Sequence, residues 1–292
     1  MTLLDRRSFL CGLAATLAAC GSKRGGSSEE QGAKPLRVVS LSPSTTEAVF
    51  AIGAGSLLVG RSRFCDFPAE AKALPAVGGF SDPNLEAVLA LRPTLVVGAR
   101  GPAGPGLAET LEARGIATFF PETESFDQID AMIAELGKKL DHAADATGVR
   151  GAITGKRDAV LRATKAIAPP RAVMLFDVAP IVVAGPGGFP DEMMRLAGAK
   201  NLITEGGAYP TIGLERLIAL DPEVILDGAT AGVEGPSPLA AKREAPGWSR
   251  LQAFAKGRAV AVGSTALRPG PRIGEGLVEL ARSIHGSAIS LP

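Results

Sequence analysis

The strongest constraint on the fold is a block of sequence that occurs twice, at residues 80–97 and again at residues 209–226. Both copies begin with an aromatic residue, and at matching offsets both contain a Leu-Glu pair, an Ala-Leu pair and a proline. The glutamates of the two Leu-Glu pairs are Glu86 and Glu215. A chain that uses one unit twice is expected to form two similar lobes, which here would face a shared cleft.

Each copy predicts a short helix followed by a strand. Asp82 and Thr211 are good N-cap residues, each four positions before its glutamate. Pro93 and Pro222 are expected to end the two helices, and the mostly apolar residues directly after each proline favour a buried strand. Repeated helix and strand units are typical of an α/β fold.

The remaining local patterns agree with this class. Short β-rich runs at 37–41 and 171–176 predict the first strand of each half. The segment that begins at Ser42 predicts a helix that ends near the glycines of 51–55, and residues 190–197 predict another helix. Strand and helix therefore follow one another at the start of both halves.

Residues 1–20 resemble an export signal rather than part of the fold. Residues 5–10 (DRRSFL) resemble a twin-arginine signal, an apolar run follows, and residues 17–20 (LAAC) match a lipobox. In a lipobox the cysteine is lipidated and becomes the mature N-terminus. The alternative is an uncleaved anchor helix, but an apolar run of about ten residues is too short for a bilayer, which requires roughly twenty. We therefore predict lipidation at Cys20.

Residues 21–35 are rich in glycine, serine and charge, which predicts a flexible tether. Beyond the signal, acidic and basic side chains balance in number, so the charge does not favour nucleic acid as a partner. We expect an exported protein that is anchored by lipid at the cell envelope, on the periplasmic side or on the outer cell surface.

The folded part divides into three predicted segments. Residues 36–140 are expected to form an N-terminal lobe and residues 169–292 a C-terminal lobe, because each holds its own strands and helices. Apolar residues at helical spacing precede a second helical stretch that ends before a Pro-Pro pair, so a helix over 141–168 is predicted to connect the lobes. Three glycines in this stretch count against the helix, since each costs up to about 1 kcal/mol relative to alanine.

Cysteine and histidine usage argues against disulfides, metal sites and enzyme chemistry. Cys65 is the only cysteine after Cys20, so it has no disulfide partner and is expected to be a small packed side chain. The only histidines, His142 and His285, belong to no cluster with metal-ligand spacing, which disfavours a bare metal ion as ligand. Residues 185–188 are glycine-rich but match no phosphate-binding motif, and no nucleophile elbow is present. A binding protein fits better than an enzyme.

Several motifs together resemble a known family. They are residues 37–47 (RVVSLSPSTTE), residues 65–68 (CDFP), the Leu-Glu and Ala-Leu-x-Pro groups of both repeats, and residues 269–273 (PGPRI). In this order they look like the iron-siderophore, haem and cobalamin binding proteins of ABC importers. The resemblance implies two Rossmann-like lobes joined by one long helix, with the ligand in the cleft and modest hinge motion. It also implies a monomer without enzymatic activity or resident cofactor, which delivers its ligand to a permease dimer with its ATPase.

The resemblance gives a role to the two repeated glutamates. In that family a surface glutamate on each lobe contacts arginines of the permease, and Glu86 and Glu215 occupy the matching positions. The alternative is that each only stabilises its helix dipole, an effect of roughly 0.3 to 1 kcal/mol. A dipole role would not require the same offset from an aromatic residue in both halves, but it is the family resemblance that leads us to expect permease docking.

Aromatic residues are scarce, with one tyrosine, one tryptophan and eleven phenylalanines, so those near the predicted cleft are informative. Phe80 and Tyr209 are expected on opposite walls. The resemblance adds Phe64 as an aromatic contact and Arg268 as a polar contact. The other predicted ligand-binding residues are Ser42, Pro43, Ser44 and Arg100.

Four of the side chains considered for the cleft could instead have purely structural roles. Phe64 or Phe80 could be ordinary core residues, because phenylalanine is usually buried. Trp248 is expected to pack against the last helices, and Arg272 to hold the C-terminal segment by an ion pair.

Three ligands remain open. Cobalamin fits best, because it brings its own cobalt ligands and needs only aromatic and hydrogen-bonding walls. Haem iron would need an axial side chain, for which Tyr209 is the cleft candidate. A ferric siderophore is anionic and would need arginines, which Arg61, Arg63, Arg100 and Arg268 could provide.

Overall fold

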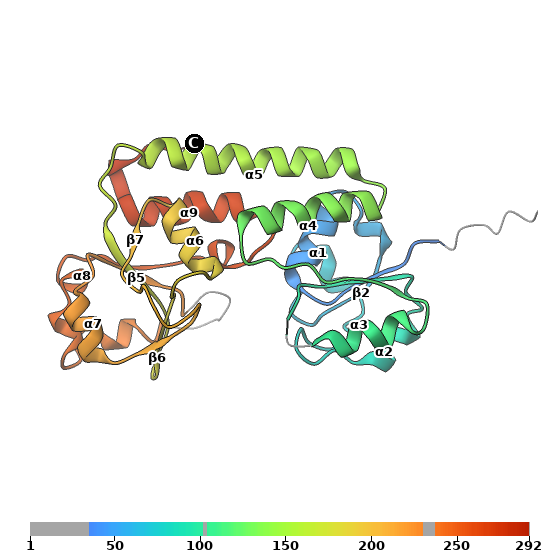
Figure 1. Cartoon of the computed structure of the whole chain (residues 1–292), viewed down its shortest axis with the longest axis horizontal. Helices are drawn as coiled ribbons and strands as arrows, with labels where there is room; N and C mark the ends of the chain where they lie inside the picture. Colours follow the sequence, from blue (N-terminus) through green and yellow to red (C-terminus); the bar gives the residue numbers. More distant parts are fainter. Residues whose placement is uncertain (1–34, 102–103, 230–236, 292) are drawn as a thin grey trace, which may run out of the picture. The chain divides into compact units, whose positions relative to one another are not determined.

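The structure is a computed structural model that describes residues 35–101, 104–229 and 237–291 (Figure 1). Within these ranges the chain forms two sheets, one in each predicted lobe, with helices packed on them. The α/β class predicted from the repeats is therefore confirmed. The predicted export signal, Cys20 and residues 21–34 of the tether lie outside the described residues.

The N-terminal lobe holds a parallel sheet with strand order β2-β1-β3-β4. Its elements in chain order are β1 (Val38–Ser40), α1 (Pro43–Ala51), η1 (Gly55–Leu57), β2 (Leu58–Arg61), η2 (Ala69–Ala73), α2 (Leu85–Ala90), β3 (Leu95–Val97), α3 (Gly104–Glu112), β4 (Ala117–Phe119) and α4 (Phe126–Lys139). Alternate residues of β1 enter different apolar clusters, Val38 on one face and Val39 on the other. Both faces are covered, so every residue of the central strands β1 and β3 is buried, rather than every second one.

The C-terminal lobe holds a mixed sheet with strand order β10-β9-β5-β6-β8, and β7 also pairs with β5. The connecting helix and the elements of this lobe are α5 (Ala143–Thr164), β5 (Arg171–Val178), β6 (Ile181–Val183), α6 (Phe189–Leu196), β7 (Lys200–Asn201), β8 (Thr211–Ile212), α7 (Leu214–Leu220), β9 (Val224–Asp227), η3 (Ala240–Lys242), η4 (Trp248–Arg250), α8 (Gln252–Ala255), β10 (Ala259–Ala261), η5 (Ser264–Leu267), α9 (Ile273–His285) and η6 (Gly286–Ala288). Strands β10, β9 and β7 run parallel to their neighbours, whereas β6 and β8 are antiparallel.

The two repeat helices are α2 and α7, but the predicted caps are wrong. Asn84 caps α2 by accepting a hydrogen bond from the N–H of Ala87 at 3.0 Å, while Asp82 is held by Arg63. Gly213 occupies the N-cap of α7, because Thr211 is extended in β8. Both helices end before their prolines, as predicted.

An arginine at the first strand of each lobe completes the repeated unit. Arg37 donates from Nη2 to the carbonyl of Leu91 at 2.7 Å, at the end of α2. Arg171 donates to the carbonyls of Leu220 and Asp221, at the end of α7. The last carbonyls of a helix lack partners within it, so the same positive group satisfies and stabilises both repeat helices.

The long helix α5 packs against α4 on one side of the molecule and against α9 on the other (Figure 1). It runs without interruption through Gly148, Gly151 and Gly155, each of which has nothing within 4 Å of where a Cβ would lie. These glycines face open space rather than making room for a neighbour. Packing of the opposite face, which includes Ile153 and Val160, therefore outweighs their low helix propensity.

A single apolar cluster extends through both lobes. It contains Val38 and Val97 of the first sheet, Met174 and Leu226 of the second, and residues of α4, α5 and α9 such as Ile284. A separate cluster fills the far side of the C-terminal sheet and includes Trp248, which is buried as expected for a packing residue.

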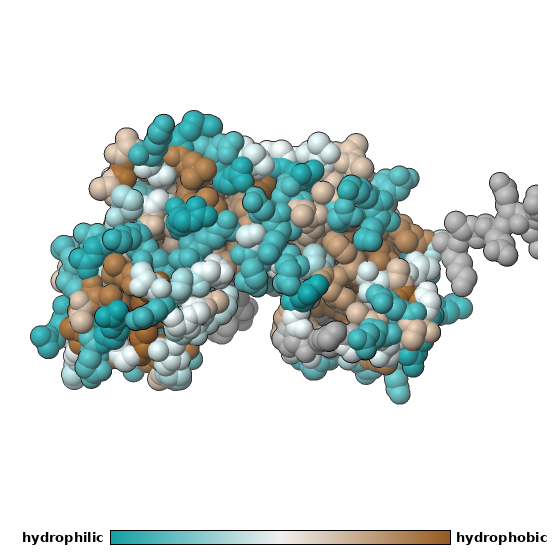
Figure 2. Space-filling view, in the orientation of Figure 1, coloured by the Kyte–Doolittle hydropathy of each residue, from teal (hydrophilic) through white to brown (hydrophobic). Residues whose placement is uncertain are grey.

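The surface in the view of Figure 2 is mostly hydrophilic or intermediate, with hydrophobic residues in separate patches. The large hydrophobic side chains exposed among the described residues are Phe64, Phe67, Leu161 and Tyr209. None of the helices described here is long and apolar enough to cross a bilayer.

Candidate functional site

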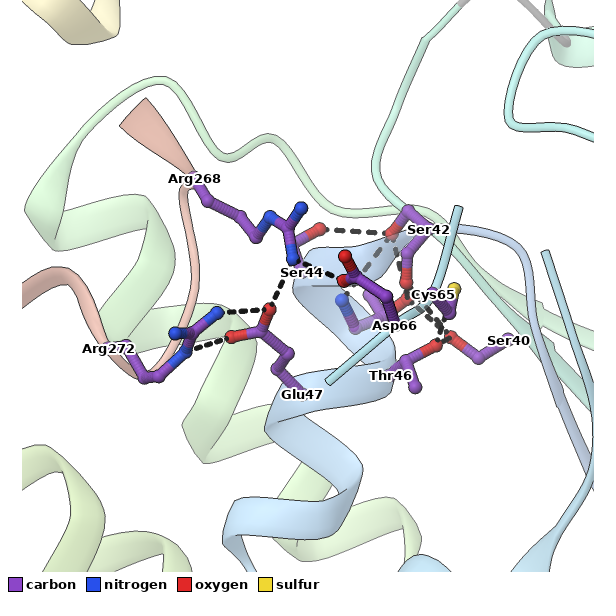
Figure 3. Close-up of polar contacts among 10 residues, drawn as sticks. Ser40, Ser42, Ser44, Thr46, Glu47, Cys65, Asp66, Arg268 and Arg272 are labelled. Atoms are coloured by element: carbon purple, nitrogen blue, oxygen red, sulfur yellow. Dashed lines mark hydrogen bonds and ion pairs between the residues drawn. The ribbon is translucent and has the colours of Figure 1, made fainter. Parts of the chain in front are cut away.

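The turn between β1 and α1 presents hydroxyl groups that are already bonded to one another. Ser42 is the N-cap of α1, and its Oγ also accepts a hydrogen bond from the N–H of Ala99 at 2.9 Å. The same Oγ lies 3.0 Å from Oγ of Ser44 (Figure 3). It also lies 2.9 Å from Oγ1 of Thr45. The network ties the ends of β1 and β3 together and fixes the backbone of the turn.

This turn forms one wall of a cavity of about 300 Å³ that both lobes line. Six of the eight predicted ligand residues are on its wall, namely Ser42, Pro43, Ser44, Phe80, Arg100 and Arg268. The remaining lining residues are Ala99, Thr123, Glu124, Ser264, Leu267 and Pro269. The mixture of an aromatic ring, hydroxyls and a few charges is typical of small-molecule sites.

Phe80 is the aromatic residue of this cavity. Its ring lies over Gly101, where an added Cβ would come within 2.5 Å of Cζ of Phe80. Glycine at 101 therefore leaves room for the Cζ end of the ring close to the backbone, and Phe80 is only partly buried. The alternative that Phe80 is an ordinary core residue is disfavoured by this position.

The other two predicted aromatic contacts do not line this cavity. Phe64 is 51% exposed, with the guanidinium of Arg63 over its ring at 4.8 Å, so it is not a core residue either. Tyr209 is 52% exposed and packs edge-on against Phe176, with ring centroids 5.5 Å apart. Burial raises the pKa of Tyr209, and the charge of Glu124, on the cavity wall, raises it further.

Glu47 was not among the predicted site residues, yet it is the central charge of the site. It is only 2% exposed and bonds to Arg272 through both oxygens, at 2.8 and 2.9 Å. It also accepts from Nη1 of Arg268 at 3.0 Å. In Figure 3 both arginines reach from the C-terminal lobe to Glu47 on α1. The ion pair expected for Arg272 is therefore confirmed, and it joins the two lobes.

Asp66 completes this network. Its Oδ1 accepts a second hydrogen bond from Nη1 of Arg268, at 2.8 Å. Partial burial opposes ionisation of Asp66, but the hydrogen bond and charge of Arg268 outweigh it, so the pKa of Asp66 lies below its ordinary value. The guanidinium of Arg272 also stacks on the ring of Phe67, 3.9 Å from its centroid.

A second cavity, of about 370 Å³, lies where α1, α5 and the start of α9 meet. Glu47 and Arg272 are part of its lining, as are Lys156 and Glu275, which form an ion pair at 2.7 Å. None of the predicted ligand residues lines it. Glu47 thus lines the second cavity and is bonded to Arg268, which lines the first.

Glu86 and Glu215 are exposed in the first turns of α2 and α7. Neither carboxylate forms an ion pair with a residue that the structure describes. An exposed carboxylate in a first helical turn interacts favourably with the helix dipole and remains available to a partner.

The groups considered for other chemistry have structural roles. Cys65 is buried, accepts a hydrogen bond from Thr46 at 3.0 Å, and has a pKa raised by burial. His285 lies 2.8 Å from the carbonyl of Ala197, and His142 pairs with Asp145. In the part of the chain with described positions, no group of histidine, cysteine and acidic residues is arranged to hold a metal ion.

Comparison with known proteins gives a consistent result. A family model described as periplasmic binding protein matches residues 38–266. A vitamin B12-binding protein of Yersinia pseudotuberculosis is 31% identical over 199 residues, which cover 66% of this chain and 70% of that protein.

Two solved structures extend this comparison. A periplasmic haem-binding protein of Pseudomonas aeruginosa has a TM-score of 0.76 at 29% identity, covering 88% of this chain and 96% of that one. The periplasmic vitamin B12-binding protein of Vibrio cholerae has a TM-score of 0.74 at 23% identity, with coverage of 85% and 96%, and shows the shared fold.

Proposed function

Because the chain belongs to the periplasmic binding protein family, we propose that it captures cobalamin, a corrinoid, between its lobes and delivers it to the permease of an ABC importer. The part of the site that takes the ligand is the cavity of about 300 Å³ with Phe80 and Arg268 on its wall. Tyr209 extends the site from the C-terminal lobe. The vitamin B12-binding relative in Yersinia pseudotuberculosis supports this ligand.

The charges around the cavity are paired, and this pairing favours an uncharged ligand. Arg100 is bonded to Glu122 at 3.0 Å, and Arg268 is bonded to both Glu47 and Asp66. Glu124 adds a further carboxylate to the wall. A strongly anionic ferric siderophore would meet these carboxylates as like charges, whereas cyanocobalamin carries no net charge and needs no excess of arginine.

Haem is the second candidate, supported by the haem-binding protein of Pseudomonas aeruginosa and by the exposed Tyr209. A tyrosine binds haem iron as the phenolate. The raised pKa of Tyr209 favours the neutral phenol, so the surroundings of this residue suit a stacking role better than ligation. A neutral ring beside a corrin is the arrangement we favour.

The ligand is tested by calorimetric titration of the purified protein with cyanocobalamin, haem and a ferric siderophore in parallel. Saturable binding of cyanocobalamin that is tighter than that of the other two would support the proposal. Tight binding of haem with no heat from cyanocobalamin would assign the protein to haem instead.

We further propose that Glu86 and Glu215 dock the protein onto arginines of the permease. Replacing either by glutamine is expected to leave ligand affinity unchanged while lowering uptake in cells, and the double variant should lower uptake further. The loss relative to wild type should depend on salt and shrink as ionic strength rises in reconstituted vesicles, because exposed charge pairs are screened over about 8 Å at physiological salt. A clear drop in ligand affinity for Glu86→Gln alone would place that residue in the binding site instead.

Finally, we propose that Cys20 is lipidated and holds the protein at the membrane. Cys20→Ser is expected to move the exported protein from the membrane fraction to the soluble fraction, because a serine cannot be acylated in the lipobox. Fractionation followed by immunoblotting measures the change. If the variant stays with the membrane as wild type does, the anchor lies elsewhere.

A further inference from the structure

Two carboxylates and two guanidinium groups form the charge network that joins the lobes. Glu47 uses both oxygens on Arg272 and shares one of them with Arg268, so it is the common partner of two guanidinium groups. A single carboxylate cannot neutralise two arginines. Asp66 supplies the second negative charge, at 2.8 Å from Nη1 of Arg268. The network of Glu47, Asp66, Arg268 and Arg272 is neutral only with Asp66 included.

Asp66 differs from Glu47 in exposure. Its side chain is 54% exposed, whereas that of Glu47 is 2% exposed. An ion pair with an exposed partner contributes little to folding, so a contribution to stability does not explain the place of Asp66 in the network. Its partner Arg268, however, lines the ligand cavity, and its side chain is 22% exposed there.

The bonds of Arg268 limit what it can offer to a ligand. Both N–H groups of Nη1 are used, one on Glu47 and one on Asp66 (Figure 3). Nη2 and Nε of Arg268 form no hydrogen bond with the described residues, so a ligand carboxylate could reach them, but it would then lie near Asp66 as a like charge. Discrimination between ligands often comes from such a repulsive element rather than from added attraction.

We propose that Asp66 determines ligand specificity by occupying Arg268 and so disfavouring anionic ligands at this cavity. The proposal rests on the proposed binding of an uncharged corrinoid at the same cavity. Asp66 acts on the ligand through Arg268 and through its own charge, and it needs no contact with the corrin. The ionised state that this role requires is favoured at neutral pH, because the pKa of Asp66 lies below its ordinary value.

The test compares ligands that differ in one charge. Cyanocobalamin and a cyanocobalamin monocarboxylic acid share the corrin ring, but one amide of the second compound is a carboxylate. We expect wild type to prefer the uncharged compound, and Asp66→Asn to reduce that preference by about fivefold, since one charge has been removed near the ligand. Asp66→Glu, which keeps the charge, should retain the wild-type preference.

Asp82→Asn is the matched control. It also removes a carboxylate from an exposed arginine pair, that of Arg63 at 2.9 Å, but neither partner lines the cavity. Its preference should equal that of wild type. An Asp66→Asn variant that binds cyanocobalamin normally and keeps the wild-type preference would overturn the proposal.

A second pair of ligands distinguishes failure of the Asp66 proposal from failure of the proposal that the ligand is a corrinoid. If wild type binds haem and not cyanocobalamin, the proposed ligand is wrong, and haem is then compared with its uncharged dimethyl ester. A gain in preference for haem over the ester in Asp66→Asn would still support the role of Asp66, and no change would overturn it. Failure of wild type to bind any of the four compounds would overturn both proposals.

Discussion

Glu47→Gln is expected to lower the free energy of unfolding by about 3 kcal/mol, because breaking a buried ion pair leaves an uncompensated charge. The glutamine keeps the size of the side chain but removes the charge that two arginines share. Arg268 and Arg272 are 22% and 28% exposed, so water can solvate them in part, and the lower end of the usual range applies. Urea unfolding followed by circular dichroism measures the change.

Asp82→Asn again provides a comparison, because the Arg63–Asp82 pair is exposed on both sides. Such pairs contribute about 0–1 kcal/mol, so the control should unfold within about 1 kcal/mol of wild type. Equal stability of the Glu47 and Asp82 variants would mean that the Glu47 network is not a stabilising contact.

Tyr209→Ala is expected to weaken ligand binding by about thirtyfold or more, since removing an aromatic anchor from a binding hot spot costs at least about 2 kcal/mol. Tyr209→Phe separates the two candidate ligands. A corrin stacked on the ring should lose little affinity, whereas haem iron bound by the phenolate would lose its axial ligand and the matching absorption bands.

Leu161→Ala is a suitable control for Tyr209→Ala. Leu161 is also an exposed hydrophobic residue, at 41%, but it lies on α5 and lines neither cavity. Affinity should be unchanged in this variant. A Tyr209→Ala protein that binds cyanocobalamin as tightly as wild type would remove Tyr209 from the site.

Local patterns were sufficient to predict the elements that the repeat contains. The helices α2 and α7 and the strands that follow them depend on apolar residues and on proline, which act within a few residues. Helix starts were harder to place, because several residues that can cap a helix stand in a row before α2. Asp82 binds Arg63 instead, which left Asn84 to cap the helix.

The predicted ligand residues came from scarce residue types and from the family resemblance, and six of them line one cavity. The charge network was not predicted. Glu47 is 221 residues from Arg268 in sequence, and no local pattern joins such distant partners. One signal was available, because Glu47 stands among small and apolar residues of a helix, and a charge buried there requires a partner.

The apolar cluster that passes through both lobes makes the protein one cooperative unit despite its two sheets. Residues of β1, α5, β5 and α9 share this cluster, so neither lobe can unfold without exposing the core of the other. The free energy of ligand binding at the cleft then adds to the free energy of unfolding of both lobes together. A single melting transition would then report ligand binding from any residue of this shared cluster, including those far from the ligand.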